Sequence, residues 1–289
     1  MDNTARRMWT RYEPVHDVTY FAPEARAAAD ALGMRGFWMG YVAQRVAPLG
    51  AVGPRVATAA FHGFHPSRLE RALPEAWTVA GPGQALAARL DGVDAALRRV
   101  WGADGVASPQ VSEAADLAWA AAQAADTAGR VLAAANQDLP RPRQPHLALW
   151  QATTTLREHR GDGHIAVLVA RGIGPLTSHL VKVAADESEP AALQTGRRFT
   201  DGAWQSGIDD LRAAGLLDAD GALTDAGCAL HDDVEAATDA AASQPWRALG
   251  AEATDRLAEL LTPLAGAVLH SGMIPEPNPV GIVLEGLEQ

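Results

Sequence analysis

The sequence of 289 residues is long enough for one large domain or two domains of ordinary size, and its 48% hydrophobic residues suffice for a core. The formal net charge of −11 opposes non-specific binding to nucleic acid, and a single cysteine, Cys228, excludes an intrachain disulfide. There is no signal-peptide pattern and no run of about 20 apolar residues that could cross a membrane, so we expect a cytoplasmic protein without membrane contact.

The N-terminal part shows the 3.6-residue periodicity of amphipathic helices. Pro14 should bend or interrupt the first of them, whereas Pro23 stands at a favourable first position of the second. Proline and glycine turns separate the later helices, and the proline-rich residues 139–145 form an extended end. We expect helices over residues 4–20, 23–33, 37–46, a segment starting at Ser67, 84–101 and 108–136.

The C-terminal part follows the same organisation. Gly161-Asp162-Gly163 should break its first helix, because two glycines allow a backbone turn there. Residues 215–224 resemble a short hairpin with an Asp-Gly turn, and Thr200 is a suitable cap for the helix before it. We expect helices over residues 147–160, 164–172, 176–186, 201–214, 225–242 and 251–270, and therefore a mostly α fold.

Short motifs recur in the two parts, in the same order and at a nearly constant offset. The ordered series indicates a tandem duplication with its join near Pro145, giving two halves, residues 1–145 and 146–289. The matched pairs are Trp9 with Trp150, Gly36 with Gly174, residues 64–66 with 199–201, 90–96 with 231–237, and 139–142 with 274–277.

Residues 204–227 (WQSGIDDLRAAGLLDADGALTDAG) resemble the recognition helix, wing and following helix of MarR-like winged-helix proteins. Over its full length the chain is similar to an actinobacterial family of proteins with such a C-terminal part, in residues 16–21, 64–66, 157–164 and 277–279. The resemblance implies a winged-helix unit in each half. A duplicated MarR-like unit would form within one chain the pseudo-dimer that such proteins form from two chains, with a pocket between the halves.

The expected recognition helix is poorly suited to DNA. Carboxylates on the helix and wing repel a polyanion, and they are Asp209, Asp210, Asp218 and Asp220. Only Arg197 and Arg198, just before the helix, suit phosphate contacts. We therefore expect nucleic acid not to be a partner, since fold and function often diverge.

The densest group of polar residues lies at the expected helix break, over residues 157–164. It contains Arg157, His159, Arg160, Asp162 and His164. Imidazoles exchange protons near neutral pH, a neighbouring carboxylate orients them, and arginines bind organic anions. We therefore predict that His159, Asp162 and His164 are catalytic and that Arg157 and Arg160 bind the substrate; the alternative is a set of helix-capping side chains.

The N-terminal half offers two further groups. Glu13, His16 and Tyr20 share one helical face, so we predict that His16 joins the catalytic group and that Glu13 and Tyr20 contact the substrate across the pseudo-two-fold axis. His62 and His65 form a short motif before Pro66 and are further candidates for substrate binding. For His65, capping of the following turn is the interpretation we favour.

No glycine-rich nucleotide motif, nucleophile elbow or HExxH zinc motif is present, which disfavours nucleotide cofactors and serine-hydrolase chemistry. A metal ion held by His16, His159 or His164, or a haem group, remains open as a cofactor. We favour a small-molecule-binding protein that acts as an enzyme on a small organic anion and has lost DNA recognition, with no assignable reaction. The alternatives are a ligand-responsive MarR-like regulator and a structural interaction protein. We expect a monomer or a homodimer.

Overall fold

The computed structural model describes residues 3–276 and 278–282. Within these residues the fold is helical, with one isolated antiparallel bridge between Leu217 and Leu223 and no longer strand, which confirms the predicted mostly α fold. The helices are α1 (Thr4–Phe21), α2 (Pro23–Ala31), α3 (Gly36–Val46), the 3-10 helix η1 (Ala47–Leu49), α4 (Pro54–Phe61), α5 (Pro66–Glu70), α6 (Ala76–Val79), α7 (Pro82–Val106), α8 (Pro109–Ala124), α9 (Val131–Gln137), α10 (Pro145–Ala170), α11 (Pro175–Ala184), α12 (Pro190–Arg197), α13 (Asp201–Ala213), α14 (Asp225–Ala241), α15 (Gln244–Leu249) and α16 (Ala251–His270).

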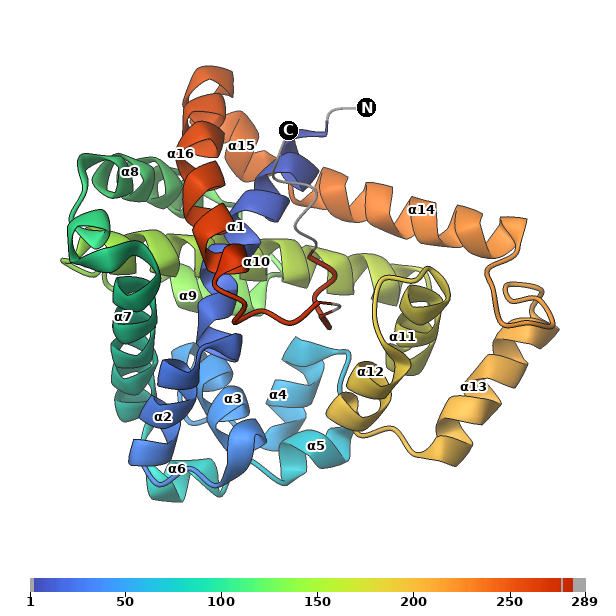
Figure 1. Cartoon of the computed structure of the whole chain (residues 1–289). Helices are drawn as coiled ribbons and strands as arrows, with labels where there is room; N and C mark the ends of the chain where they lie inside the picture. The colour runs from blue at the N-terminus through green and yellow to red at the C-terminus, as the bar shows by residue number, and fades with distance from the viewer. Residues whose placement is uncertain (1–2, 277, 283–289) are drawn as a thin grey trace.

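Helix α10 is the central element and crosses the middle of the molecule (Figure 1). Its 26 residues make it about 39 Å long at 1.5 Å per residue. Pro145 occupies its first turn, where no intrahelical N–H bond is lost. The helix packs against α1, α7, α8, α9 and α14, so both of its faces are buried over most of its length.

The prediction that Gly161-Asp162-Gly163 breaks this helix is wrong, because α10 continues from Pro145 to Ala170. Gly163 is needed for close packing. The guanidinium of Arg130 crosses α10 at this point and donates hydrogen bonds to the carbonyls of His159 and Ala241. A Cβ on residue 163 would collide with that guanidinium, so the glycine makes room for a neighbour and does not form a turn.

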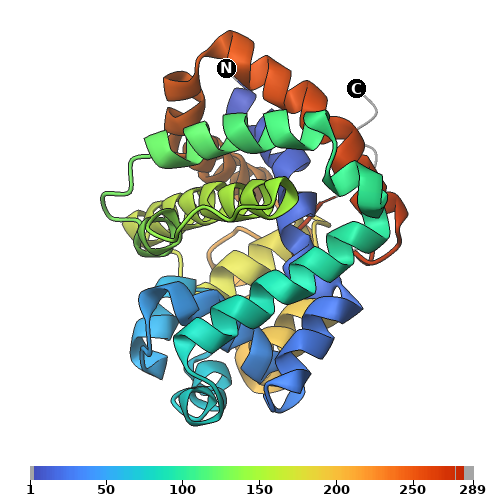
Figure 2. The ribbon, with the colours of Figure 1, turned by 90° about the vertical axis from the view of Figure 1, so that its left-hand side faces the viewer.

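The N-terminal helices pack against α10, against α16 and against one another. Helix α1 is continuous through Pro14 and lies against α10 and α16. Helix α7 lies along α2 (Figure 2), and a Cβ on Gly92 would come within 2.7 Å of the Cα of Ala25. The core between α1, α8, α10 and α16 contains Met8, Tyr12, Val111, Leu149 and Leu257, all nearly inaccessible to solvent.

Helices α11, α13 and α14 form over the segments where the sequence predicts helices. Thr200 caps α13 by accepting from the N–H of Ala203, and Thr224 caps α14 through Gly227. Between them, the Leu217–Leu223 bridge closes the expected hairpin-like segment. Gly207 allows α13 to approach α11, since a Cβ there would lie 2.6 Å from Leu180.

The sequence repeat pairs the segment that begins α5 with the one that begins α13. Helix α5 has five residues where α13 has 13, and no β-bridge follows α5 among the described residues. The two-fold pseudo-dimer therefore stays a prediction.

One predicted helix is two helices in the structure. Residues 108–136 divide into α8 and α9, because Asp126 accepts a turn hydrogen bond from the N–H of Ala128 and Gly129 has φ of 72°. The short helices α4 and α12 form where no helix was expected.

After α16 the chain runs back across α10 towards α11 (Figure 1), which places residues 279–281 beside the centre of the molecule. Residue 277, part of the sequence motifs 274–277 and 277–279, lies outside the described residues.

Among the described residues, no individual helix combines the length and the apolar composition needed to cross a membrane. Only α10 and α11 taken together meet that criterion, and a bend of 104° separates them.

Candidate functional site

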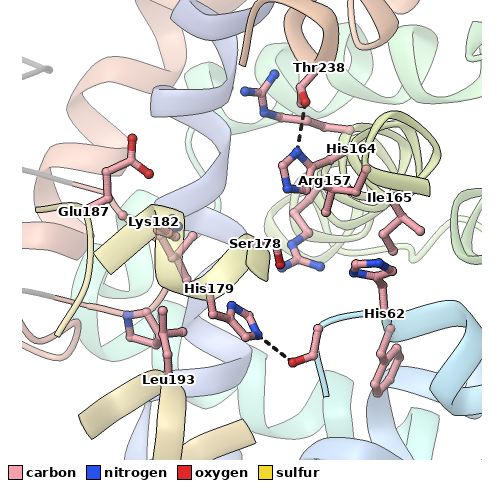
Figure 3. Close-up of a pocket in the computed structure, with 18 of the residues that line it drawn as sticks. His62, Arg157, His164, Ile165, Ser178, His179, Lys182, Glu187, Leu193 and Thr238 are labelled. Atoms are coloured by element: carbon pink, nitrogen blue, oxygen red, sulfur yellow. Dashed lines mark hydrogen bonds between the residues drawn. The ribbon is translucent and has the colours of Figure 1, made fainter. Parts of the chain in front are cut away.

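A cavity of about 310 Å³ lies where α10 meets α1, α4, α11, α12 and α14. Figure 3 shows side chains of α10 and α11 extending into the same space, with the ring of His62 beside Arg157. Its basic lining residues are Arg6, Arg45, Arg157, Arg160, Lys182 and Arg197, and its acidic ones are Glu13, Glu187 and Glu235. In a chain with a net charge of −11, basic residues outnumber acidic ones in the lining of this cavity, called here the central pocket.

Most of these cations are paired with carboxylates. Arg157 donates to Glu13 at 3.2 Å and to Glu158 at 3.1 Å, and Arg45 makes a bidentate pair with Glu158 at 2.9 and 3.0 Å. Despite burial, the two arginines keep the pKa of Glu158 below its usual range. The pKa of Glu13 is raised by burial, which Arg157 opposes.

A second ion-pair group lies at the α14 end of the pocket. Arg160 donates to Asp239 at 2.6 Å, and Arg6 donates to Asp239 at 3.1 Å and also pairs with Glu235. Both guanidinium groups lie over the ring of Trp9, at 5.4 Å for Arg6 and 5.1 Å for Arg160. These pairs fix α1 and α10 against α14 and leave their cations compensated.

Arg197 and Lys182 have no carboxylate within ion-pair distance among the described residues. Arg197 lies 4.1 Å from the centre of the Phe64 ring and is hydrogen-bonded to the phenol of Tyr41. Lys182 donates to the carbonyl of Val280 at 2.9 Å. Burial lowers the pKa of both side chains, because no neighbouring carboxylate fully compensates the loss of solvent.

One ring nitrogen of His164 is hydrogen-bonded, and the other has no hydrogen-bond partner among the described residues. Its Nδ1 lies 2.9 Å from the hydroxyl of Thr238, and that hydroxyl donates its own proton to the carbonyl of Val234 at 2.8 Å. Nδ1 must therefore be the donor, which leaves Nε2 as an acceptor with no hydrogen-bond partner among the described residues. Burial lowers the pKa of His164 to about 4, so the ring is neutral at pH 7.

Two more histidines border the central pocket. His179 lies 2.6 Å from the carbonyl of Gly63 through Nε2, and burial lowers its pKa to about 3. His62 has a backbone φ of 50°, a strained conformation for a residue with a Cβ, and burial lowers its pKa. Gly63 packs closely against this ring, since a Cβ on residue 63 would lie 3.0 Å from the His179 ring.

His16 and Tyr20 line a separate cavity of about 10 Å³ on the other side of Arg45 and Glu158. Nδ1 of His16 lies 2.9 Å from the hydroxyl of Thr154, which donates to the carbonyl of Trp150. Nε2 of His16 is buried without a partner, and burial lowers the pKa well below its usual value. The structure therefore places Glu13 in the central pocket, with His16 and Tyr20 beside it in a space of about one water molecule.

His159 and Asp162 lie on the opposite face of α10. Asp162 accepts from the backbone N–H groups of Leu132 and Ala133 at 2.9 Å each, at the start of α9. Burial raises the pKa of Asp162 to about 6, so it remains ionised at pH 7 and suits the positive end of that helix. His159 is 1% exposed and has a pKa lowered to about 4, chiefly by burial.

Of the other sequence-predicted residues, Arg157, Arg160, His164 and His62 line the central pocket. His65 does not; it accepts from the N–H of Ser67 and caps α5, as favoured from the sequence. The described residues contain no group of three or more His, Cys, Asp or Glu side chains arranged for a metal ion. His164 lines the central pocket, His16 lines the cavity of about 10 Å³, and His159 lines neither.

The sequence did not indicate several residues of the pocket. His179 and Lys182 follow Ser178 on one face of an otherwise apolar helix, a signal that was available. The sequence suggested Arg197 only as a residue that could contact DNA phosphates before α13. In the structure its side chain lines the central pocket. Arg6, Arg45 and Glu235 reach the pocket through tertiary packing, for which the sequence gives no signal.

Residues 5–275 match a family described as a helix-turn-helix family. No curated protein and no solved structure matches the chain significantly. The matched region covers both halves and contains every helix that lines the pocket.

Proposed function

The chain belongs to a helix-turn-helix family, and from this premise we propose that it binds a small organic anion in the central pocket. The observation that carries the proposal is the pair Arg197 and Lys182, two cations that face a cavity of about 310 Å³ without a carboxylate partner among the described residues. Buried cations are costly unless paired, so an anionic ligand would supply the missing charge. A guanidinium and an ammonium together suit a carboxylate or a phosphate.

His164 gives the bound anion a further partner. Its ring is neutral at pH 7, and Nε2 has no partner among the described residues. A negative charge nearby favours the protonated ring, because opposite charges raise the pKa of an imidazole. Anion binding should therefore be accompanied by proton uptake, after which Nε2–H donates to the ligand.

An enzymatic role uses the same groups. A proton held at Nε2 of His164 can be transferred to a bound substrate, and Arg157 can stabilise negative charge that develops in the reaction. The reaction class stays open, and turnover of any ligand identified by binding is the measurement that separates an enzyme from a binding protein.

The binding proposal is tested by isothermal titration calorimetry with small carboxylates and inorganic phosphate. We expect Arg197→Gln and Lys182→Met each to weaken binding by about tenfold or more, since charge-assisted hydrogen bonds contribute about 1.5–3 kcal/mol. Arg55→Gln is the control, because Arg55 is an exposed arginine on α4 outside the pocket. Equal affinities in the wild type and both pocket variants would overturn the proposal.

A ligand-responsive regulator is the second candidate, and the position of Arg197 favours it. Arg197 is the last residue of α12, and three residues separate it from Asp201, which begins α13, the position of the helix that helix-turn-helix proteins present to DNA. A ligand bound by Arg197 would therefore change the position of α13. Fluorescence anisotropy with genomic DNA fragments at low salt, with and without bound anion, tests it; we expect no tight binding, and sub-micromolar sequence-specific binding would favour the regulator.

The closer likeness to MarR-like proteins and the internal pseudo-dimer also belong to this proposal. Segments paired by the sequence repeat lie together, since the N–H of His65 donates to the carbonyl of Arg197 at 3.1 Å and Arg198 reaches the carbonyl of Ser67. Contact between equivalent segments is what a two-fold axis produces. Related sequences aligned half against half should show matching apolar positions; their absence would contradict the duplication.

A further inference from the structure

A second cavity of about 80 Å³, called here the side pocket, lies between α10, α11 and α14. Its apolar lining residues are Leu168, Ile173, Val181, Leu230 and Val234. His231, which also lines it, lies 3.0 Å from Glu187 through Nε2. The side pocket therefore has apolar walls, and most of its polar lining residues are shared with the central pocket.

The side pocket adjoins the central pocket. Six residues line both: His164, Leu168, Ser178, Lys182, Glu187 and Glu235. On α14, Leu230 and Val234 border the side pocket, whereas Thr238, four residues further, borders the central pocket. Lys182 and His164 consequently stand where the two cavities meet.

From this arrangement we propose that the ligand is an amphipathic monoanion, a carboxylate that carries an alkyl or aryl group. The carboxylate lies between Arg197 and Lys182, and the apolar group extends past His164 into the side pocket. This inference rests on the proposed function, because it names the class of ligand for the same central pocket.

The volume of the side pocket sets the size of the apolar group. At about 10–15 Å³ for each water-sized group, 80 Å³ holds about five to eight such groups. A hexyl chain or a phenyl ring has this size. Each methylene buried there should tighten binding about fourfold, as expected for transfer of a methylene from water.

The charges at the side pocket exclude a second anionic group. Glu187 and Glu235 both border it, and Glu235 is held ionised by Arg6, which lowers its pKa against the effect of burial. A distal carboxylate would meet these two carboxylates in a space of low dielectric constant. The side pocket should therefore select monocarboxylates over dicarboxylates of equal length.

The experiment is a calorimetric titration of the full chain with straight-chain monocarboxylates from acetate to decanoate, and with adipate as the matched dicarboxylate for hexanoate. We expect the affinity to rise about fourfold per methylene until about six carbons beyond the carboxylate and then to level off. Adipate should bind at least tenfold more weakly than hexanoate.

Variants locate the effect in the side pocket. Val234→Phe fills the cavity and should flatten the chain-length series without changing the affinity for acetate. Ile173→Ala enlarges the cavity and should move the plateau to longer chains, which keeps the test valid if Val234→Phe fails to fold. Val169→Phe on the exposed face of α10, where residue 169 is 64% exposed, is the size-matched control.

The outcomes separate this inference from the proposed function. A flat chain-length series in the wild type, with acetate bound through Arg197 and Lys182, would overturn the amphipathic ligand and leave anion binding standing. A series unchanged in both Val234→Phe and Ile173→Ala would equally overturn it. No binding of any carboxylate or phosphate would overturn the proposed function itself.

Discussion

The two faces of α10 carry polar residues of the same kinds and use them differently. On one face, His159 and Asp162 pack against α9 and Arg130, and every charge there meets a backbone group. On the other face, Arg157 and His164 border an open space. The cluster of polar residues in the sequence therefore does not by itself reveal their roles. Whether a polar side chain of α10 is structural or available to a ligand depends on what lies opposite it, a packed helix or a cavity.

The largest effect on the free energy of unfolding is expected when Gly161 and Gly163 of α10 are each replaced by alanine. A Cβ on Gly161 meets nothing closer than 3.7 Å, whereas one on Gly163 meets the guanidinium of Arg130 and lies 3.3 Å from Ala241. Gly161→Ala should stabilise the fold by up to about 1 kcal/mol through helix propensity, and Gly163→Ala should destabilise it by about 1–2 kcal/mol through overpacking. Urea unfolding measures both; equal stabilisation would mean that Arg130 moves aside freely.

The next effect concerns the cap that α10 provides for α9. Asp162→Ala should lower the free energy of unfolding by about 1–2 kcal/mol, because two N–H groups at the start of α9 lose their acceptor. Asp162→Asn retains an acceptor and should lose less. Calorimetry on both variants should show unchanged carboxylate binding, and a loss of binding at unchanged stability would move the functional face to α9.

On the pocket face, His164→Asn keeps a donor for Thr238 and removes the atom Nε2. We expect carboxylate binding at pH 6 to weaken about tenfold, because the imidazolium that donates to the anion is lost. The rise in wild-type affinity from pH 8 to pH 6 should disappear as well. His159→Asn is the matched control on the other face, where carboxylate affinity should not change.

The smallest effect is the dependence of stability on pH. The pKa values of His159 and His164 are each lowered to about 4, below the unfolded value near 6.5, so the unfolded chain binds more protons between these limits. Stability should therefore fall as the pH falls through this range, by about 0.7 kcal/mol per histidine between pH 7 and pH 6. A saturating carboxylate should remove the His164 share only, which urea unfolding at the two pH values can detect.

Local signals in the sequence were sufficient for the predominantly helical fold and for the segment from α13 to α14. Thr200, Thr224 and the Asp-Gly turn act within a few residues of themselves, and they do so in the structure. The interpretation of Gly161 and Gly163 failed because the cost of glycine in a helix, about 1 kcal/mol each, is offset by packing that involves distant residues such as Arg130.

The site was predictable only in part for the same reason. Arg157, Arg160 and His164 follow one another along a single helix, so the sequence could group them. Lys182 and Arg197 join them because the chain bends by 104° between α10 and α11 and the later helices bring both side chains to the pocket, and no local pattern shows that convergence. Which residues join the pocket depends on how distant helices pack together, and a pattern along the sequence does not contain that information.

The length of α10 has a consequence for folding. Helix α10 packs on α1, α7, α8 and α9 from the N-terminal side of the sequence and on α14 from the C-terminal side, and so contributes to the packing of both. Neither half can unfold while leaving the other with its apolar surface covered, so denaturant should melt the chain in one cooperative transition. A ligand at 100 times its dissociation constant would then stabilise the whole chain by about 2.7 kcal/mol, and hydrogen exchange should slow in α8 as much as beside the pocket.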